Sequence, residues 1–380
     1  MRAFTRTWPG IPTVWQAVLV ALMPVVAFAQ LTGWTRIDSP VRSPLHQVCF
    51  VNAAEGFALA GHTGQMINTR DGGETWYLVG RADSVGFGAM LFRTNYLGWI
   101  AGPRGKLFRT ETGGLSWQKV PTPSRTYHYY DLLSYKNEFL IAAGTTRSFS
   151  RRKPVLEIYV DSLEAWNEVD ETLPGFSVHD LAEDSSGNLW AGGRDLLLMI
   201  PQDGSAPQVM WRGTRGKCGT IEHVCFKTAR EGWAVGSCGL MLHTLDGGRS
   251  WTEREPVSTN RLLEMGFSHP DVGYLAAERT GEGPTLFRSL DGGKSWDPLI
   301  GAGETSYYDM EITPIRIILV SGAGHIYLRE REEDYRMQGD EPPSDMVREI
   351  EGELRPGMLM QERPPGIEPE ETQQRRPLGR

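Results

Sequence analysis

The clearest pattern in the chain is a short apolar run, then a turn with two glycines, then Trp and a stretch of alternating polar and apolar residues. Four copies occur: TRDGGETW (69–76), TETGGLSW (110–117), TLDGGRSW (244–251) and SLDGGKSW (289–296). Glycine allows the positive φ of tight hairpin turns, and an Asp carboxylate can accept hydrogen bonds from turn amides. The pattern therefore predicts β-hairpins in which Trp opens the strand after the turn.

The copies recur at a period that indicates a repeat architecture. Asp71 and Thr112 are 41 residues apart, and Asp246 and Asp291 are 45 residues apart. The central gap of 134 residues fits three periods of about 45, the length of a four-stranded propeller blade. Two degenerate copies of the repeat unit lie in that gap. We therefore predict an all-β fold, a seven-bladed β-propeller.

The two ends of the repeat array complement each other. GWTRI (33–37) matches the fourth strand of a blade but has no third strand before it, whereas the last unit (307–330) lacks a fourth strand. Pairing of the N-terminal strand with the last blade would close the ring and remove exposed sheet edges.

The repeated turn residues have a structural interpretation. A catalytic residue is needed once, whereas this position recurs in several blades, and one copy has Thr in place of Asp. We assign these turn positions as structural: Asp71, Trp76, Thr112, Trp117, Asp246, Trp251, Asp291 and Trp296.

The two ends of the chain differ in composition from the repeats between them. Arg2 and Arg6 precede an apolar stretch that ends Ala27-Phe28-Ala29, the pattern of a secretory signal peptide. We therefore expect a signal peptide over 1–29, the propeller over 30–328, and an acidic, Pro-rich, disordered tail over 329–380. The mature protein would be periplasmic or secreted, would lack an integral membrane segment, and would be a monomer.

Export permits disulfides, and two of the four cysteines are placed to form one. Cys218 lies in the loop that enters its blade, and Cys238 lies in the turn between the second and third strands of that blade. Because these two loop types emerge on the same face, we predict a Cys218–Cys238 bridge. Cys49 and Cys225 occupy equivalent strand positions in distant blades and should be buried thiols.

The whole chain has a net charge of −8, and the charged residues of the propeller are unevenly distributed over its two faces. One face, here called the link face, carries the turns between second and third strands and the links between blades; the opposite face is called the Asp-box face. Basic residues gather in the link-face loops, among them Arg42, Arg81, Arg125 and the insert SRRK (150–153). Arginine suits bidentate recognition of carboxylates. We therefore expect a protein partner to bind there, through Arg104, Arg147, Arg194, Arg212, Arg215, Lys217, Arg261 and Arg279.

Polar triplets open several innermost strands at the mouth of the central channel: Tyr130-Asp131-Leu132, His179-Asp180-Leu181 and Tyr308-Asp309-Met310. A cation or ligand there is conceivable. The eight histidines show no zinc-type spacing, so we predict no metal and no cofactor. An exported, acidic chain without a matching motif is not expected to bind nucleic acid.

The turn phrase is the Asp-box, or BNR repeat. Together with the second strands GFALAG, GWIAG and GWAVG, it resembles the Ycf48/HCF136 family of photosystem II assembly factors over about residues 31–328. That resemblance implies a seven-bladed ring in the lumen or periplasm and an arginine patch that engages a membrane protein during assembly. By loop position, the patch would include Arg104, Arg194 and Arg215. The absence of Cys after the cleavage site and the acidic tail lie outside the resemblance.

The alternative is a glycan-binding protein or a sialidase-like glycoside hydrolase, because these also use Asp-box propellers. A sialidase needs an arginine triad, an early Arg-Ile-Pro segment and a Tyr/Glu pair. The chain has Pro314-Ile315-Arg316, which is reversed and near the end. No Ser/His/Asp constellation or phosphate-binding loop is present. We therefore do not expect an enzyme.

Overall fold

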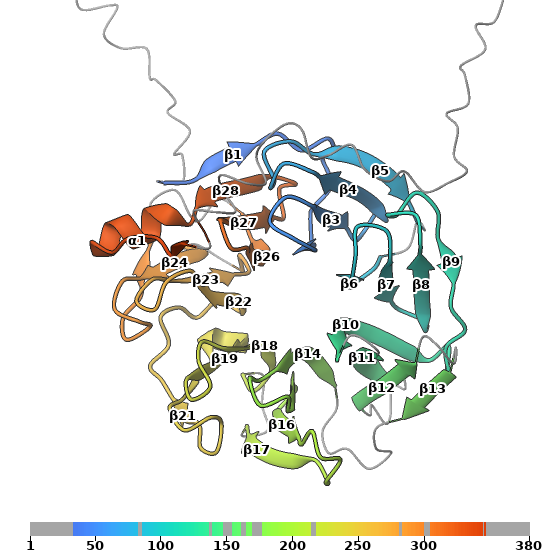
Figure 1. Cartoon of the computed structure of the whole chain (residues 1–380). Coiled ribbons are helices and arrows are strands. Elements are labelled where there is room, and N and C mark those ends of the chain that lie inside the picture. Colours follow the sequence, from blue (N-terminus) through green and yellow to red (C-terminus); the bar gives the residue numbers. More distant parts are fainter. Residues whose placement is uncertain are drawn as a thin grey trace, which may run out of the picture.

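The protein is an all-β propeller of seven blades, as the repeat period predicts. A computed structural model describes residues 33–82, 86–136, 139–146, 154–160, 165–168, 177–213, 218–280, 283–299, 305–344 and 346. Within these residues, 28 strands form seven antiparallel sheets of four strands each. Figure 1 shows the sheets arranged as a ring, with each first strand near the centre and each fourth strand at the rim.

The blades are numbered here in chain order from β2. Blade 1 contains β2 (Gln47–Phe50), β3 (Gly56–Ala60), β4 (Gln65–Thr69) and β5 (Tyr77–Arg81), and blade 2 contains β6 (Ala89–Phe92), β7 (Gly98–Gly102), β8 (Lys106–Thr110) and β9 (Gln118–Lys119). Blade 3 contains β10 (Tyr127–Tyr135), β11 (Phe139–Thr146), β12 (Pro154–Val160) and β13 (Ala165–Glu168), and blade 4 contains β14 (Val178–Glu183), β15 (Leu189–Gly193), β16 (Leu196–Ile200) and β17 (Gln208–Arg212). Blade 5 contains β18 (Ile221–Phe226), β19 (Gly232–Gly236), β20 (Met241–Thr244) and β21 (Thr252–Glu253), and blade 6 contains β22 (Leu262–Phe267), β23 (Gly273–Ala277), β24 (Leu286–Ser289) and β25 (Asp297–Pro298). Blade 7 contains β26 (Tyr307–Ile312), β27 (Arg316–Ser321), β28 (Ile326–Glu330) and β1 (Thr35–Ile37).

The second strand of each blade lies in the densest part of the core. Every residue of β3, β7, β15, β19 and β23 is buried, because a neighbouring blade covers each face of these strands. The apolar clusters lie between adjacent blades: one joins Trp233 and Val235 of blade 5 to Leu275 and Phe287 of blade 6. This burial explains why sequences such as GWAVG are continuously apolar rather than alternating.

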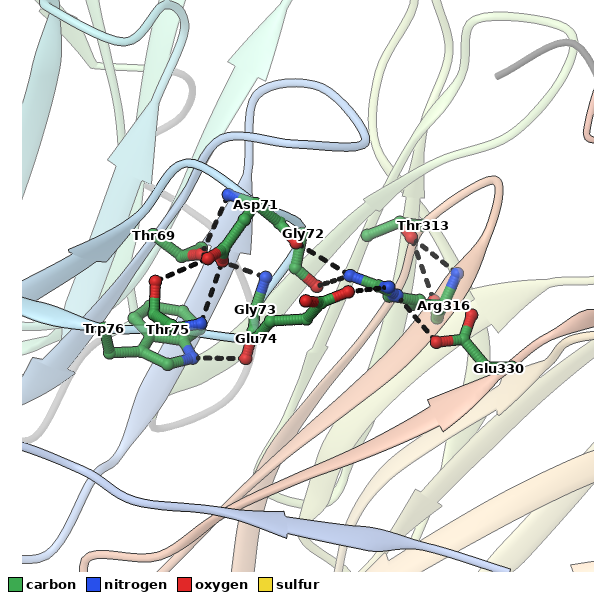
Figure 2. A network of polar contacts seen from close by, with 10 residues as sticks. All are labelled: Thr69, Asp71, Gly72, Gly73, Glu74, Thr75, Trp76, Thr313, Arg316 and Glu330. Carbon is green, nitrogen blue, oxygen red and sulfur yellow. Dashed lines mark hydrogen bonds and ion pairs between the residues drawn. The ribbon is translucent and has the colours of Figure 1, made fainter. Parts of the chain in front are cut away.

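Each Asp-box folds as a closed turn held by its own side chains. In blade 1, Asp71 Oδ1 accepts hydrogen bonds from Thr75 N at 2.9 Å and from Thr69 Oγ1 at 2.8 Å (Figure 2). Trp76 Nε1 donates to Gly73 O at 2.9 Å, and Gly73 has a φ of 94°, which favours glycine. In blade 2, Thr112 Oγ1 takes over the role of the carboxylate and accepts from Ser116 N at 2.9 Å. These contacts support the structural interpretation of the repeated positions.

A buried arginine joins the first Asp-box to the last blade. Arg316 of β27 is 4% exposed and donates to the carbonyls of Asp71 and Gly72 at 2.7 and 3.2 Å (Figure 2). Its guanidinium also pairs with Glu74 and, at 3.0 Å, with Glu330. This arginine was considered from the sequence only as part of a reversed sialidase motif. It is a contact across the junction between blades 7 and 1.

The N-terminal strand completes blade 7. Strand β1 pairs antiparallel with β28, with Thr35 opposite Leu328 and Ile37 opposite Ile326. Trp34 beside the strand is 7% exposed and lies edge-on to Tyr274 of blade 6, with ring centroids 5.4 Å apart. The ring is thus closed by strands from both ends of the propeller.

The prediction of a disordered tail from residue 329 is wrong for its first part. Strand β28 runs to Glu330, and helix α1 (Glu332–Gln338) follows and packs beside blades 6 and 7. Asp334 of α1 is fully buried and accepts hydrogen bonds from Arg329 Nε at 2.9 Å and from Tyr274 Oη at 2.9 Å. The prediction of disorder rested on the acidic composition of the tail, and composition does not show that one of these carboxylates is buried against Arg329.

The chain continues past α1 toward blade 1. Met346 is buried with Ala53 and Ile315, which lie in loops of blades 1 and 7. The rest of the tail, and the expected signal peptide over 1–29, fall outside the described residues. None of the described helices has the length and apolar character needed to cross a membrane.

Candidate functional site

The link face is built from tight turns over which the inter-blade links are packed. In blade 2, Arg104 has a φ of 66°, and the next residue, Gly105, donates its N–H to Tyr127 O at 2.7 Å. Thr122 Oγ1 donates to Gly105 O at 2.7 Å. These bonds hold the turn against the link that contains Arg125, so Arg104 and Arg125 come from adjoining segments of backbone.

The structure separates the predicted partner-binding arginines into groups. Arg104 and Arg212 are exposed, and neither forms an ion pair with any residue that the structure describes. Arg194 and Arg279 are also exposed; their backbone amides bond to Ser177 O and Ser306 Oγ. Three link residues from the sequence analysis, Arg42, Arg81 and Arg125, are exposed as well.

Arg261 differs from the others because its charge is already neutralised. Its Nε and Nη2 donate to the two carboxylate oxygens of Glu222 at 2.8 and 2.9 Å, and its Nη1 lies 3.3 Å from Glu278 Oε2. Burial alone would raise the pKa of Glu222, but hydrogen bonds from His179 and Arg261 lower it. Arg261 therefore does not offer a free cation, and we remove it from the predicted docking set. Arg147, Arg215 and Lys217, with residues 150–153, lie outside the described residues.

Four of the exposed cations of the link face lie over blades 1 to 3, whereas Arg194 and Arg212 lie over blade 4 and Arg279 lies over blade 6. Arg42 lies on the link into blade 1, Arg81 on the link from blade 1 to blade 2, and Arg104 and Arg125 over blades 2 and 3. The opposite sector, over blades 5 and 6, holds the Glu222–Arg261–Glu278 group. Sequence alone could not show this division, because it depends on which carboxylates reach which arginines.

Aromatic rings line the mouth of the central channel on this face. Tyr130 lies between His128 and His179, with both pairs of ring centroids 4.8 Å apart. Across the mouth, His46 stacks on Tyr308 at 4.9 Å and meets His62 edge-on at 4.5 Å. Burial lowers the pKa of His46 to about 4, so this imidazole is neutral near pH 7. The mouth thus adds flat, partly apolar surfaces to the surrounding arginines. The polar triplets were the signal for this feature, although the sequence analysis did not identify the stacking.

The aspartates of the triplets tie the innermost strands together. Asp131 accepts from Leu181 N at 2.9 Å, Asp180 from Val224 N at 2.7 Å, and Asp309 from Val48 N at 2.8 Å. Each bond joins one blade to the next. The sequence analysis allowed a cation here, but the carboxylates are committed to backbone amides. No group of three or more His, Cys, Asp or Glu side chains in the described part of the chain is arranged to hold a metal ion.

Below the mouth, the channel holds further ionisable groups. His223 Nε2 lies 3.0 Å from Glu264 Oε1, and its Nδ1 lies 3.7 Å from Asp180 Oδ2. Burial would lower the pKa of His223, but these two carboxylates raise it well above its ordinary value. Burial raises the pKa of Asp309 to about 6 and that of Glu311 to about 8. The ionisable groups of the channel are therefore costly to charge because they are buried. They do not form an open site for a ligand.

A disulfide fixes one edge of the link face. Cys218 and Cys238 are bonded, with S–S at 2.05 Å and the Cα atoms 5.1 Å apart, which is the pairing that the sequence predicts. Cys238 has a φ of 56° in the turn between β19 and β20. Cys49 and Cys225 are free thiols packed against the core.

Comparison with known proteins gives a consistent result. The family model described as "Photosynthesis system II assembly factor YCF48" matches residues 26–129 and 217–300. The photosystem II stability/assembly factor HCF136 of Arabidopsis thaliana is 26% identical over 309 residues, which cover 72% of each chain. The photosystem II assembly protein Ycf48 of Thermosynechococcus vestitus is 22% identical over 320 residues, 71% of this chain and 89% of that protein.

Solved structures agree on the fold. Ycf48 bound to a D1 peptide superposes with a TM-score of 0.63 at 19% identity, covering 78% of this chain and 97% of that one. Ycf48 from Cyanidioschyzon merolae gives 0.62 at 19% identity, covering 79% and 99%. Streptogramin B lyase gives 0.64 at 8% identity, so the architecture alone carries no function. The family model and the curated relatives carry more weight, and together with the fold they support the Ycf48-like family.

Proposed function

We propose that this propeller is an exported assembly factor that binds an exposed acidic segment of a membrane-protein client through its link face, without chemistry of its own. The observation that carries the proposal is a group of exposed arginines over blades 1 to 3 of an acidic protein: Arg42, Arg81, Arg104 and Arg125 form no ion pair with any residue that the structure describes. The structure of a Ycf48 relative with a D1 peptide supports binding of a peptide segment by this fold.

The physical basis is the arginine side chain itself. A guanidinium presents a planar set of donors that matches a carboxylate, and it stays charged when a partner partly desolvates it. The rings of Tyr130, His179 and Tyr308 beside the arginines supply rigid contact area at low cost in conformational entropy. The surface thus combines charge for steering with flat rings for contact.

The test compares two charge reversals of equal size on opposite faces. Arg104→Glu with Arg125→Glu alters the link face. The matched control, Arg230→Glu with Arg249→Glu, alters two exposed arginines of neighbouring loops on the Asp-box face, where Gly247 N donates to Arg230 O. Each tagged mature protein is used to capture partners from its native envelope, and the captured proteins are identified by mass spectrometry.

We expect the link-face variant to lose a membrane protein that the wild type and the control both retain. The affinity for that client's exposed segment should fall by at least about tenfold, and wild-type binding should weaken with added salt. Equal recovery by the two variants would place the docking surface elsewhere. Recovery of no protein by the wild type would remove the assembly-factor proposal itself.

A further inference from the structure

A cavity lies away from the link-face arginines, in the outer groove between blades 5 and 6. It has a volume of about 440 Å³, within the range of small-molecule sites. Blade 5 contributes Trp233 and the segment from Thr252 to Val257, and blade 6 contributes the Asp-box turn from Gly293 to Trp296. Neither the docking proposal nor the ring contacts described above account for it.

At this groove the outer strand of blade 5 is the shortest of the outer strands that face a described Asp-box turn. At four described junctions, an Asp-box turn packs against the preceding blade. The outer strands of those preceding blades, in the order blade 7, 1, 4 and 5, are β1, β5, β17 and β21. These strands have 3, 5, 5 and 2 residues. At β5, a Cβ added to Gly80 would lie 3.0 Å from Gly114 O, so that longer strand fills its groove. Strand β21 ends at Glu253, and Trp296 beside it is partly exposed.

Two indole rings form the floor and wall of this cavity. Trp233 is 1% exposed and stacks on His243 with centroids 3.8 Å apart, which fixes its orientation. A Cβ added to Gly293 would lie 2.8 Å from Trp233 Cζ2, so the turn lies directly on the edge of that ring. Trp296 meets Phe267 at 6.1 Å. The site is therefore a rigid aromatic corner.

The indole donors of this corner have no acceptor among the described residues. Trp76 and Trp251 donate their Nε1 hydrogens to Gly73 O and Gly248 O, but the Nε1 atoms of Trp233 and Trp296 are buried without a partner. Trp117 shows the same lack, so the donors alone do not define a site.

The rim carries two carboxylates and two cationic side chains. Glu253 and Glu255 alternate with Arg254 along the edge of blade 5, and Lys294 faces them from blade 6. All four side chains are exposed, and none forms an ion pair with a described residue. The formal charge of the rim is zero, so its field selects neither anions nor cations. What it offers is hydrogen bonding of both kinds beside an aromatic surface.

We propose that this groove binds a neutral carbohydrate, with the C–H face of a sugar ring against Trp296 and its hydroxyls bonded to Glu253, Arg254 and Lys294. Hydroxyl groups both donate and accept, which suits a rim of carboxylates and cations. The indole supplies the apolar contact area. An acidic sugar fits less well because a rim of zero formal charge does not offset the cost of removing water from its carboxylates. None of the four arginines of the docking proposal lines this cavity, so its test does not depend on that proposal.

The probes are neutral tetrasaccharides of the cello-, chito- and malto- series, with tetragalacturonate as the charged comparison. Binding to the full mature protein is measured by calorimetry and by tryptophan fluorescence. Trp296→Phe keeps the ring contact with Phe267 but removes the indole, and Glu253→Gln removes one rim charge without touching the core. Trp251→Phe is the control, because Trp251 is the matching Asp-box tryptophan of blade 5 and does not line the cavity.

We expect at least one neutral series to bind, and each groove variant to weaken that binding by about tenfold. Trp251→Phe should bind as the wild type does, and tetragalacturonate should bind more weakly than the neutral sugars. The proposal is overturned if no neutral sugar gives a saturable signal up to about 10 mM, or if Glu253→Gln and Trp296→Phe bind with unchanged affinity. Preferred binding of tetragalacturonate would overturn the choice of a neutral ligand.

Discussion

Two aspartates show how position within a blade decides the chemistry of a side chain. In the turn of blade 1, partial burial would raise the pKa of Asp71, but hydrogen bonds from Thr75 and Thr69 lower it. In the channel, Asp309 also accepts two backbone hydrogen bonds, yet burial raises its pKa to about 6. The same residue type is thus stabilised as an anion at the rim and penalised as an anion at the centre.

The pH dependence of stability should reveal that penalty at Glu311. Burial and the nearby Asp309 raise the pKa of Glu311 from 4.5 to about 8 in the folded protein. The folded state therefore holds a proton that the unfolded state releases, and stability falls as pH rises from 4.5 through 8. Glu311→Gln should remove on the order of 3 kcal/mol of that fall.

The measurement is urea unfolding at pH 5.5 and pH 8.5 for both proteins. Other groups face the same channel, including Asp131, Asp180, Glu264 and the imidazole of His223, so part of the slope should remain in the variant. A slope identical to that of the wild type would show that Glu311 does not carry a raised pKa.

Arg261 marks the limit of what residue types alone could predict about the site. The sequence placed it correctly in a link-face loop, as it did Arg104. The two differ because Glu222 of β18 and the residue after β23, Glu278, reach Arg261, whereas no described carboxylate reaches Arg104. Such pairings join positions 17 and 39 residues apart in sequence, so no local pattern encodes them.

Among the elements, helix α1 depends on one buried ion pair. Asp334 pairs with Arg329 Nη2 at 2.8 Å, and its side chain is fully buried. Removing one partner of such a pair leaves an uncompensated charge in the interior. Asp334→Ala should therefore lower the free energy of unfolding by about 3–5 kcal/mol.

The control for α1 is Glu332→Ala, which removes a pair with the exposed Arg336. Because exposed helix pairs contribute little, this change should cost about 0.5 kcal/mol or less. Equilibrium unfolding in urea compares the two variants. Similar costs for both would mean that α1 does not stabilise blades 6 and 7.

The disulfide is the second element whose contribution can be isolated. It joins residues 20 apart and tethers the entry of blade 5 to its β19–β20 turn. Replacing both Cys218 and Cys238 with Ser should cost about 2–4 kcal/mol. Reductant should shift the unfolding midpoint of the wild type but not that of the double variant. A shift of similar size in both would assign the effect to something other than this bond.

At the scale of the whole molecule, the sequence was sufficient to predict the ring because the fold repeats one local unit. The same features recur in several blades: turn glycines, the Trp after each turn and continuous apolar second strands. A repeat that has lost one of these features can therefore still be recognised by comparison with the others. Two contacts that occur once were not predicted: Arg316 across blades 7 and 1, and Asp334 of α1 with Arg329. A unique contact has no second copy against which to compare it.

Closure of the ring is one such unique feature, and Trp34 is the residue that tests it. Its side chain is 7% exposed and packs in the cluster between blades 6 and 7, beside the three residue pairs of β1 and β28. Trp34→Ala should cost about 3–5 kcal/mol, as for other buried aromatics. Tyr77→Ala is the control, because Tyr77 also lies on an outer strand but is 61% exposed.

Loss of Trp34 should have a consequence beyond stability. If β1 detaches, β28 becomes an exposed edge with unpaired N–H and C=O groups, which can pair with another chain. Size-exclusion chromatography with light scattering should then detect oligomers of Trp34→Ala under conditions in which Tyr77→Ala keeps the mass of the wild type. If Trp34→Ala is destabilised but keeps the mass of the wild type, β1 stays paired through its backbone alone. A variant as stable as the wild type would show that closure does not depend on this side chain.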